Sequence, residues 1–149
     1  YNEDLMANWR IFLLAKGCVY LPFAGYHYRQ HTTSMSHALP PKSLDDQRTA
    51  ALRIRESVPT QWPALQQSAD AFYYEKLVYL TSMILRRENT ELYRVQYGEM
   101  LIAISGGLKD RCLGRNPRLP FVMRLAAIAT VRCPKLWRKL CRKYLKDRQ

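Results

Sequence analysis

The chain has 149 residues, the size of one ordinary domain, and 48% of them are hydrophobic, which is ample for a folded core. Its net charge of +12 is uneven: residues 1–108 contain eleven Lys or Arg against ten Asp or Glu, whereas residues 109–149 contain thirteen against two. The positive charge is concentrated near the C-terminal end and is not spread over the whole protein. It therefore predicts one local surface that meets phosphates, lipid or nucleotide.

A helix is predicted over residues 4–16, followed by short strands. Its apolar residues recur at helical spacing and are Leu5, Trp9, Phe12 and Leu13. Gly17 is expected to end the helix in the left-handed conformation. Residues 18–29 are rich in aromatic and β-branched residues, interrupted by a proline and a glycine, which is typical of short β-strands. The N-terminal part is therefore predicted to be a mixed α/β piece.

Residues 30–41 form a predicted loop that is rich in hydroxyl groups and histidine and ends in two prolines. A polar connection of this length is either mobile or functional. The pattern then becomes helical. Ser43 and Asp46 approximate a capping box for a helix that ends before Pro59.

Two further helices are predicted next, one over residues 62–87 and one from Thr90 to the glycines at positions 106 and 107. The first of them carries the aromatic cluster Phe72, Tyr73 and Tyr74. Such a cluster could line a ligand site, but aromatic residues at helical spacing more often belong to the core. We therefore expect these rings to be packing residues.

The four cysteines are scattered along the chain, so neither a zinc site nor a disulfide framework is predicted. Reduced thiols in a cytosolic protein are the expected state. The longest apolar run, residues 121–131, is interrupted by Arg124, and a helix needs about 20 residues to cross a bilayer. No transmembrane helix is expected.

The C-terminal stretch, residues 133–149, predicts a basic amphipathic helix. Its apolar face would carry Leu136, Trp137, Leu140, Cys141, Tyr144 and Leu145. Aromatic residues beside Lys and Arg are typical of a helix that lies in the membrane interface. The candidate membrane-surface residues are Trp137, Arg138, Lys139, Arg142 and Lys143. The alternative is a last helix packed on the body with a solvated basic face. Nucleic-acid binding is less favoured, because contacts with phosphates gain nothing from an aligned Leu and Trp stripe.

Glu3 and Asp4 are adjacent carboxylates at the start of the first predicted helix. Both suit the helix dipole, and Asn2 or Asp4 could serve as the N-cap, so a purely structural role is one interpretation. The later loop, however, holds Arg29, His31 and Ser34. Their side chains offer a planar fork, an imidazole and a hydroxyl donor, which together suit a diphosphate.

An Asn-Glu-Asp-Leu entry into a helix, a short apolar strand, and Tyr-x-Tyr-Arg followed by Ser-x-Ser characterise residues 1–37. This combination resembles the C-terminal part of the catalytic domain of family-2 glycosyltransferases with the GT-A fold, of the bacterial polysaccharide-synthesising kind. The helical pattern beyond residue 42 predicts a mainly α chain, and the resemblance implies that residues 1–41 are the C-terminal segment of an α/β GT-A catalytic domain. Residues 42–149 would be a helical C-terminal extension.

The resemblance also implies the activity: inverting, metal-dependent transfer of a sugar from a nucleotide-sugar donor to a cell-surface polysaccharide or a lipid-linked acceptor. Asp4 would be the catalytic base, and Glu3 would orient the acceptor or the helix start. Arg29 and Ser34 would contact the diphosphate of the donor. His31 would contact the diphosphate or bind the metal.

The metal implied by the resemblance is Mg or Mn. His27 and His37 compete with His31 for the role of its protein ligand. The Asp-x-Asp motif that positions the metal in this family does not occur in the sequence, so a missing N-terminal half would hold most of the metal's ligands. The chain is therefore predicted to be a C-terminal fragment that is inactive alone, with first residues that have lost their sheet.

Two other functions stay open on the sequence. One is a helical adaptor or membrane-surface module that acts through the basic C-terminal helix, and the other is nucleic-acid binding through the same charge. The enzyme requires Asp4, Arg29 and Ser34, whereas the module does not depend on them. The expected location is the cytoplasm, with peripheral binding at the inner face of the cell membrane.

Overall fold

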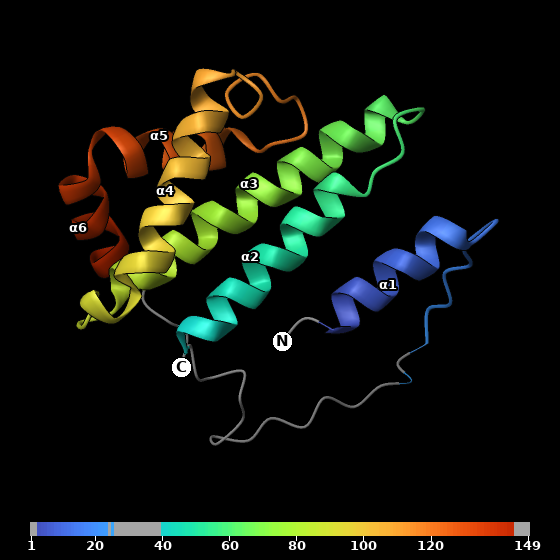
Figure 1. The fold of residues 1–149 in the computed structure, drawn as a ribbon, viewed down its shortest axis with the longest axis horizontal. Coiled ribbons are helices and arrows are strands. Elements are labelled where there is room, and N and C mark those ends of the chain that lie inside the picture. Colours follow the sequence, from blue (N-terminus) through green and yellow to red (C-terminus); the bar gives the residue numbers. More distant parts are fainter. Residues whose placement is uncertain (1–2, 24, 26–39, 145–149) are drawn as a thin grey trace.

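The computed structural model describes residues 3–23, 25 and 40–144 of the chain (Figure 1). Its elements, in chain order, are α1 (Glu3–Leu14), α2 (Pro41–Glu56), α3 (Pro63–Arg86), the 3-10 turn η1 (Glu91–Tyr93), α4 (Arg94–Lys109), α5 (Phe121–Arg132) and α6 (Pro134–Tyr144). The described residues contain no strand. The expectation of a mainly α chain is confirmed.

Proline marks the start of most of these helices. Pro41, Pro63 and Pro134 are the first residues of α2, α3 and α6, and Pro120 directly precedes α5. Proline is tolerated there because the first amide groups of a helix have no acceptor within it. A proline in the sequence therefore marks the start of four of the described helices.

The predicted capping box of α2 is wrong. The helix begins at Pro41, with Pro40 as its N-cap, so Ser43 lies inside the first turn and is buried. The Ser43 hydroxyl oxygen instead accepts a hydrogen bond from Nε2 of Gln47 at 3.3 Å. With a proline at the first position, the N-cap is Pro40, three residues before the predicted one.

The long helix α3 is the centre of the bundle. It packs against α2, α4, α5 and α6 (Figure 1). Leu77 and Leu80 of α3 are completely buried, together with Leu44 of α2 and Met100 and Ile104 of α4. The buried cluster that these residues form contains no member from the described part of α1. The core is thus built around α3.

Tyr73 and Tyr74 are buried in this core, as predicted from their helical spacing. Their rings meet edge to face, with centroids 5.2 Å apart. The guanidinium of Arg55 lies over both rings, at 5.1 and 5.4 Å from the centroids, and Nε of Arg55 lies 2.6 Å from Oδ1 of Asp70. Burial raises the pKa of Tyr74 despite the nearby Arg55 cation. The cluster therefore connects α2 with α3, and Asp70 compensates the positive charge of Arg55.

Helix α4 continues through the two glycines that were expected to end it. Thr90 precedes η1, not α4, and α4 ends at Lys109. Gly107 faces the ring of Tyr74, and a Cβ at this position would overlap that ring. A close approach between α3 and α4, and not a helix stop, explains this glycine.

The connection from α4 to α5 is fixed by Asn116, which is buried. Its Nδ2 donates to the main-chain oxygen of Gln67 at 2.8 Å, and its Oδ1 accepts from the amide of Arg118 at 2.8 Å. Leu113 and Leu119 of the same connection are buried in the core. One amide side chain thereby holds this loop against α3.

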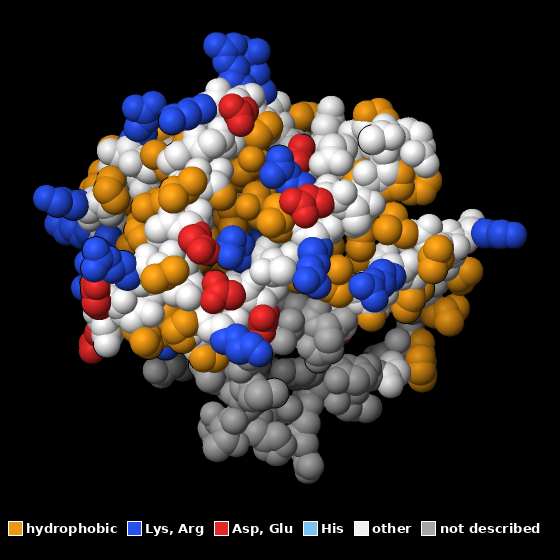
Figure 2. Space-filling view, in the orientation of Figure 1, with side chains coloured by type: hydrophobic (Ala, Val, Ile, Leu, Met, Phe, Trp, Pro, Cys, Tyr) orange, Lys and Arg blue, Asp and Glu red, His pale blue; other side chains and the backbone are white. Residues whose placement is uncertain are grey.

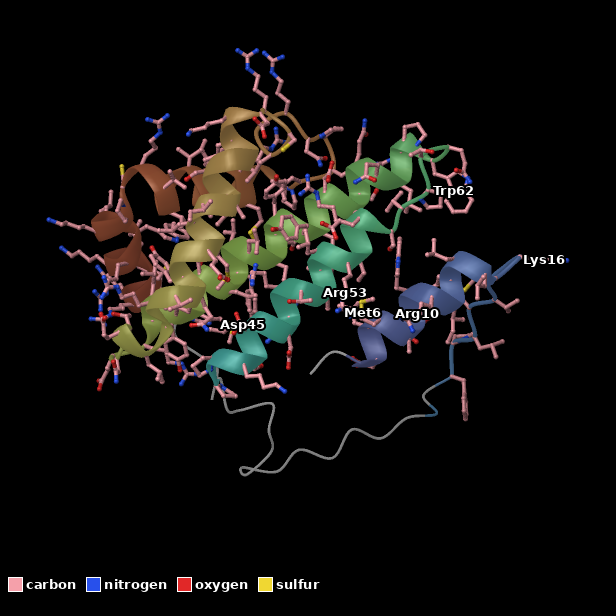
Figure 3. The ribbon with its side chains drawn as sticks, viewed as in Figure 1. Met6, Arg10, Lys16, Asp45, Arg53 and Trp62 are labelled. Atoms are coloured by element: carbon pink, nitrogen blue, oxygen red, sulfur yellow. The ribbon has the colours of Figure 1, made fainter. Side chains whose placement is uncertain are left out.

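Helix α1 lies beside α2 at the edge of the bundle (Figures 1 and 3). Nε1 of Trp9 donates to Oγ of Ser57 at 2.7 Å, which joins α1 to the end of α2. The helix ends at Leu14, and Gly17 does not adopt the predicted left-handed conformation. Figure 3 shows Lys16, just beyond the helix, pointing away from the bundle.

The predicted strands over residues 18–29 are wrong for the part of that range that the structure describes. Residues 18–23 are neither helix nor strand, and Val19, Tyr20, Leu21 and Phe23 are exposed. A strand requires a neighbour that pairs with its amide and carbonyl groups, and the described residues offer none. Residues 24 and 26–29 lie outside the described part.

Candidate functional site

Asp4 lies in the first turn of α1 and is exposed. Its Oδ1 accepts a hydrogen bond from the amide of Leu5 at 2.7 Å. The N-terminal end of a helix favours negative charge, so this position suits an ionised carboxylate. A carboxylate that is exposed at a helix start can accept a proton from a hydroxyl group brought to it.

The other residues of the predicted catalytic site lie outside the described part. They are Arg29, His31 and Ser34, together with His27 and His37. The side chain of Glu3, the first residue of α1, also lies outside it. Among the residues that are described, no group of three or more His, Cys, Asp or Glu is arranged to hold a metal ion. The predicted Mg or Mn therefore has no candidate site within the helical bundle.

A mainly apolar pocket of about 400 Å³ lies between α1 and the bundle. It is lined by Leu5, Asn8, Trp9, Phe12, Ile54, Leu65, Ser68, Ala69 and Phe72. None of these side chains is charged, so the pocket does not suit a diphosphate or a metal ion. It is the junction through which α1 packs on α2 and α3.

The outer side of α1 and the residues that follow it form a second apolar region. The exposed side chains are Ile11, Leu14, Val19, Tyr20, Leu21 and Phe23, and Phe12, which lines the inner pocket, is also largely exposed. Figure 2 shows hydrophobic side chains gathered at this end of the molecule. Exposed apolar side chains gathered at one end of a protein are typical of an interaction surface.

The basic C-terminal helix is present as α6. An open groove of about 570 Å³ is lined by five cations: Lys135, Arg138, Lys139, Arg142 and Lys143. Figure 2 shows Lys and Arg side chains gathered at the side of the molecule where α6 lies. The lining of this groove consists of cations alone, whereas the pocket beside η1, which shares Lys135 and Arg138 with it, also contains Glu91.

Arg142 and Arg138 also attach α6 to the end of α3. Nε and Nη2 of Arg142 donate to the main-chain oxygens of Leu85 and Arg87 at 3.3 and 2.9 Å. Nη2 of Arg138 donates to Oγ1 of Thr90 at 3.4 Å. The last carbonyl groups of a helix lack partners within it and carry partial negative charge, so cations are favoured there. Two of the predicted membrane-surface residues thus have a structural role.

The apolar residues of α6 divide between two faces. Cys141 is completely buried, and Trp137 is partly buried against the core, whereas Leu136, Leu140 and Tyr144 are exposed. The helix is therefore packed on the body, which was the alternative interpretation, and it also presents an apolar stripe to the outside. The sequence predicted a single apolar face for these residues. In the structure Trp137 lies on the face of α6 that packs against the core.

A similar outer stripe on α5 was missed by sequence analysis. Phe121, Leu125 and Ile128 are exposed, while Ala126 and Ala127 are buried. The signal was present in the sequence: large apolar residues recur at i, i+4 and i+7, and small residues lie on the opposite side of the helix. The small residues allow α5 to pack closely on α3 and α4.

All four cysteines are free thiols. Cys141 is completely buried, and burial raises the pKa of its thiol and so disfavours the thiolate. In the described ranges, no helix combines the length and the apolar character needed to cross a bilayer.

Comparisons with known proteins found no match for this chain. No protein-family model, no curated protein and no solved structure matches it.

Proposed function

We propose that this chain is the C-terminal portion of an inverting, metal-dependent glycosyltransferase. It would transfer a sugar from a nucleotide-sugar donor to a cell-surface polysaccharide or a lipid-linked acceptor. The observation that carries the proposal is the position of Asp4. Its carboxylate is exposed at the N-terminal end of α1, in the motif that resembles the base motif of family-2 enzymes.

In this proposal Asp4 removes the proton from the acceptor hydroxyl while the hydroxyl oxygen attacks the anomeric carbon of the donor. The new bond joins that oxygen to the anomeric carbon, and the bond from this carbon to the diphosphate breaks on the opposite face. The proton passes to Asp4, and the electron pair leaves with the nucleoside diphosphate. Glu3 would orient the acceptor or the start of α1.

Arg29, Ser34 and His31 would contact the diphosphate, where donors offset the charge that grows on the leaving group. A bound Mg or Mn would supply further positive charge at the same place. The described residues contain no cluster that fits this metal, so its ligands are expected in a nucleotide-binding part of the enzyme or in the loop that carries His31.

The exposed apolar residues of α1 and of positions 19–23 support a larger catalytic domain. Phe12, Leu14 and Phe23 are exposed in the described chain, although large apolar side chains gain free energy when they are buried. A nucleotide-binding part packed against them would cover this region. The isolated chain lacks a donor site in its described residues, so we expect it to be inactive alone.

The test uses the gene product that contains these residues together with a nucleotide-binding part. Release of nucleoside diphosphate from a panel of nucleotide sugars is measured for the wild type, for Asp4→Asn and for Asp110→Asn. Loss of a general base should lower kcat by about 10² to 10⁴-fold in Asp4→Asn. Asp110 is exposed at the end of α4 and is the matched control. Wild-type turnover by Asp4→Asn would overturn the proposal.

A further inference from the structure

Helices α5 and α6 are consecutive, with Cys133 between them, and they pack against each other. The outer stripe of α5 consists of Phe121, Leu125 and Ile128, which are 66%, 49% and 43% exposed. Their spacing places them on one face of the helix. Burial of these side chains would remove a substantial apolar area from water.

The outer stripe of α6 consists of Leu136, Leu140 and Tyr144, which are 59%, 37% and 67% exposed. These residues are four positions apart, so they too follow one face. Lys135, Lys139 and Lys143 are exposed on the same helix and border the basic groove. Each outward-facing apolar residue on α6 thus has a lysine as its chain neighbour.

The charge along this part of the sequence has one sign, although Glu91 of η1 lines a pocket together with Lys135 and Arg138. Residues 111–144 contain ten Lys or Arg and no Asp or Glu. In most exposed protein surfaces both signs are mixed, which limits long-range attraction to any one partner. Here the exposed apolar stripes lie within a stretch that would attract an anionic surface.

We propose that α5 and α6 together form a surface that lies on anionic lipid bilayers. The two apolar stripes would enter the boundary between headgroups and acyl chains, and the lysines would contact anionic headgroups. The structure favours lipid over nucleic acid because six exposed apolar side chains would gain nothing from phosphate contacts alone. The inference does not depend on the transferase proposal, since it uses no residue of α1.

The position of Trp137 affects which measurement can detect binding to lipid. Trp137 is partly buried against the core and is therefore a poor probe of lipid insertion. Flotation with vesicles avoids this difficulty. The purified chain is mixed with phosphatidylcholine vesicles that either contain or lack phosphatidylserine, and the bound fraction is measured at low and high salt. We expect binding to the anionic vesicles only, and weaker binding at high salt.

Two pairs of variants test the two components of the surface. Leu136→Ser with Leu140→Ser should reduce vesicle binding about tenfold or more, because two apolar side chains no longer enter the lipid. Leu92→Ser with Ile102→Ser is the matched control, since both residues are exposed elsewhere, in η1 and α4. The control variant should bind like the wild type.

Lys139→Gln with Lys143→Gln should reduce binding about 30-fold, the effect expected for two cations near an anionic membrane. Lys16→Gln with Lys42→Gln removes the same charge from exposed positions on other parts of the chain and should have little effect. Circular dichroism melting of each variant separates loss of binding from loss of folding.

Three outcomes would overturn the inference. The first is absence of binding to anionic vesicles, and the second is equal binding by the α6 variants and their controls. The third is nucleic-acid binding that the serine variants leave unchanged while vesicles are not bound. Asp4→Asn should bind vesicles like the wild type, so failure of the transferase proposal would not appear as failure of this one.

Discussion

Arg142 donates from Nη2 to the main-chain oxygen of Arg87 at 2.9 Å, across the junction between α6 and the end of α3. Its Nε donates to a second carbonyl, that of Leu85. The residue that sequence analysis assigned to a membrane surface is therefore also the C-terminal cap of the central helix. This relationship gives the first prediction.

Arg142→Met should lower the free energy of unfolding by about 1–2 kcal/mol, because two hydrogen bonds from a charged donor are lost. Methionine retains most of the apolar stem. Urea unfolding followed by circular dichroism measures the change, with Lys139→Met as the matched control. Lys139 is exposed, so its replacement should change the free energy by less than about 0.5 kcal/mol. Equal stability of the two variants would show that Arg142 does not hold α6 in place.

Gly107→Ala should destabilise the protein by about 1–3 kcal/mol, because a Cβ at this position overlaps the ring of Tyr74. Gly106 provides an internal control, since a Cβ there meets nothing within 4 Å. Gly106→Ala should stabilise α4 by up to about 1 kcal/mol, because alanine is the better helix former. Thermal melting measures the two changes in stability, which should have opposite signs: a lower melting temperature for Gly107→Ala and a higher one for Gly106→Ala. Stabilisation by both substitutions would contradict the close packing of α3 on α4.

Asn116→Ala should destabilise the protein by about 1–3 kcal/mol, because the buried side chain donates to Gln67 and accepts from Arg118. Asn89→Ala removes an amide from an exposed position and should have little effect. Urea unfolding compares the two. If the variants unfold at the same urea concentration, the connection between α4 and α5 is not held by Asn116.

The stability of the protein should fall at alkaline pH. Burial raises the pKa of Tyr74, so the folded chain keeps the phenol proton at pH values where the unfolded chain has released it. Above about pH 10, the ordinary tyrosine pKa, the unfolded state then binds fewer protons, and the free energy of unfolding decreases as pH rises. Tyr74→Phe should reduce this slope between about pH 9 and 11. Urea unfolding across that range measures it, and an unchanged slope would contradict the prediction.

The sequence predicted the helices where their own pattern was sufficient. The helix expected over residues 62–87 is α3, Pro63–Arg86, because a long and broad apolar pattern leaves few alternatives. The strands over residues 18–29 failed in the described part, because a strand depends on a partner that a local pattern does not reveal. The N-caps of α2 and α4 were each misplaced by three residues, because side-chain caps at Ser43 and Thr90 were preferred over the proline that starts α2 and the 3-10 turn that precedes α4.

The orientation of helix faces was the harder part of the candidate site. The amphipathic pattern of α6 was recognised, but the sequence placed Trp137 and Leu140 on the same apolar face of the helix. In the structure Trp137 packs against the core, whereas Leu140 is exposed. In α5, small residues face the core because they permit close approach of the helices, while Phe121 remains outside. Such choices depend on the volume available between helices, which a single sequence does not specify.

Helix α3 contains 24 residues and packs against four other helices, whereas α1 adds no residue to the buried cluster in its described part. The different packing of α3 and α1 implies different rates of amide hydrogen exchange in the two helices. Amides in the middle of α3 should exchange only when the whole bundle opens, while those of α1 should exchange through local opening that leaves the bundle folded. The chain therefore contains two levels of cooperativity, and the helix that carries Asp4 belongs to the weaker one.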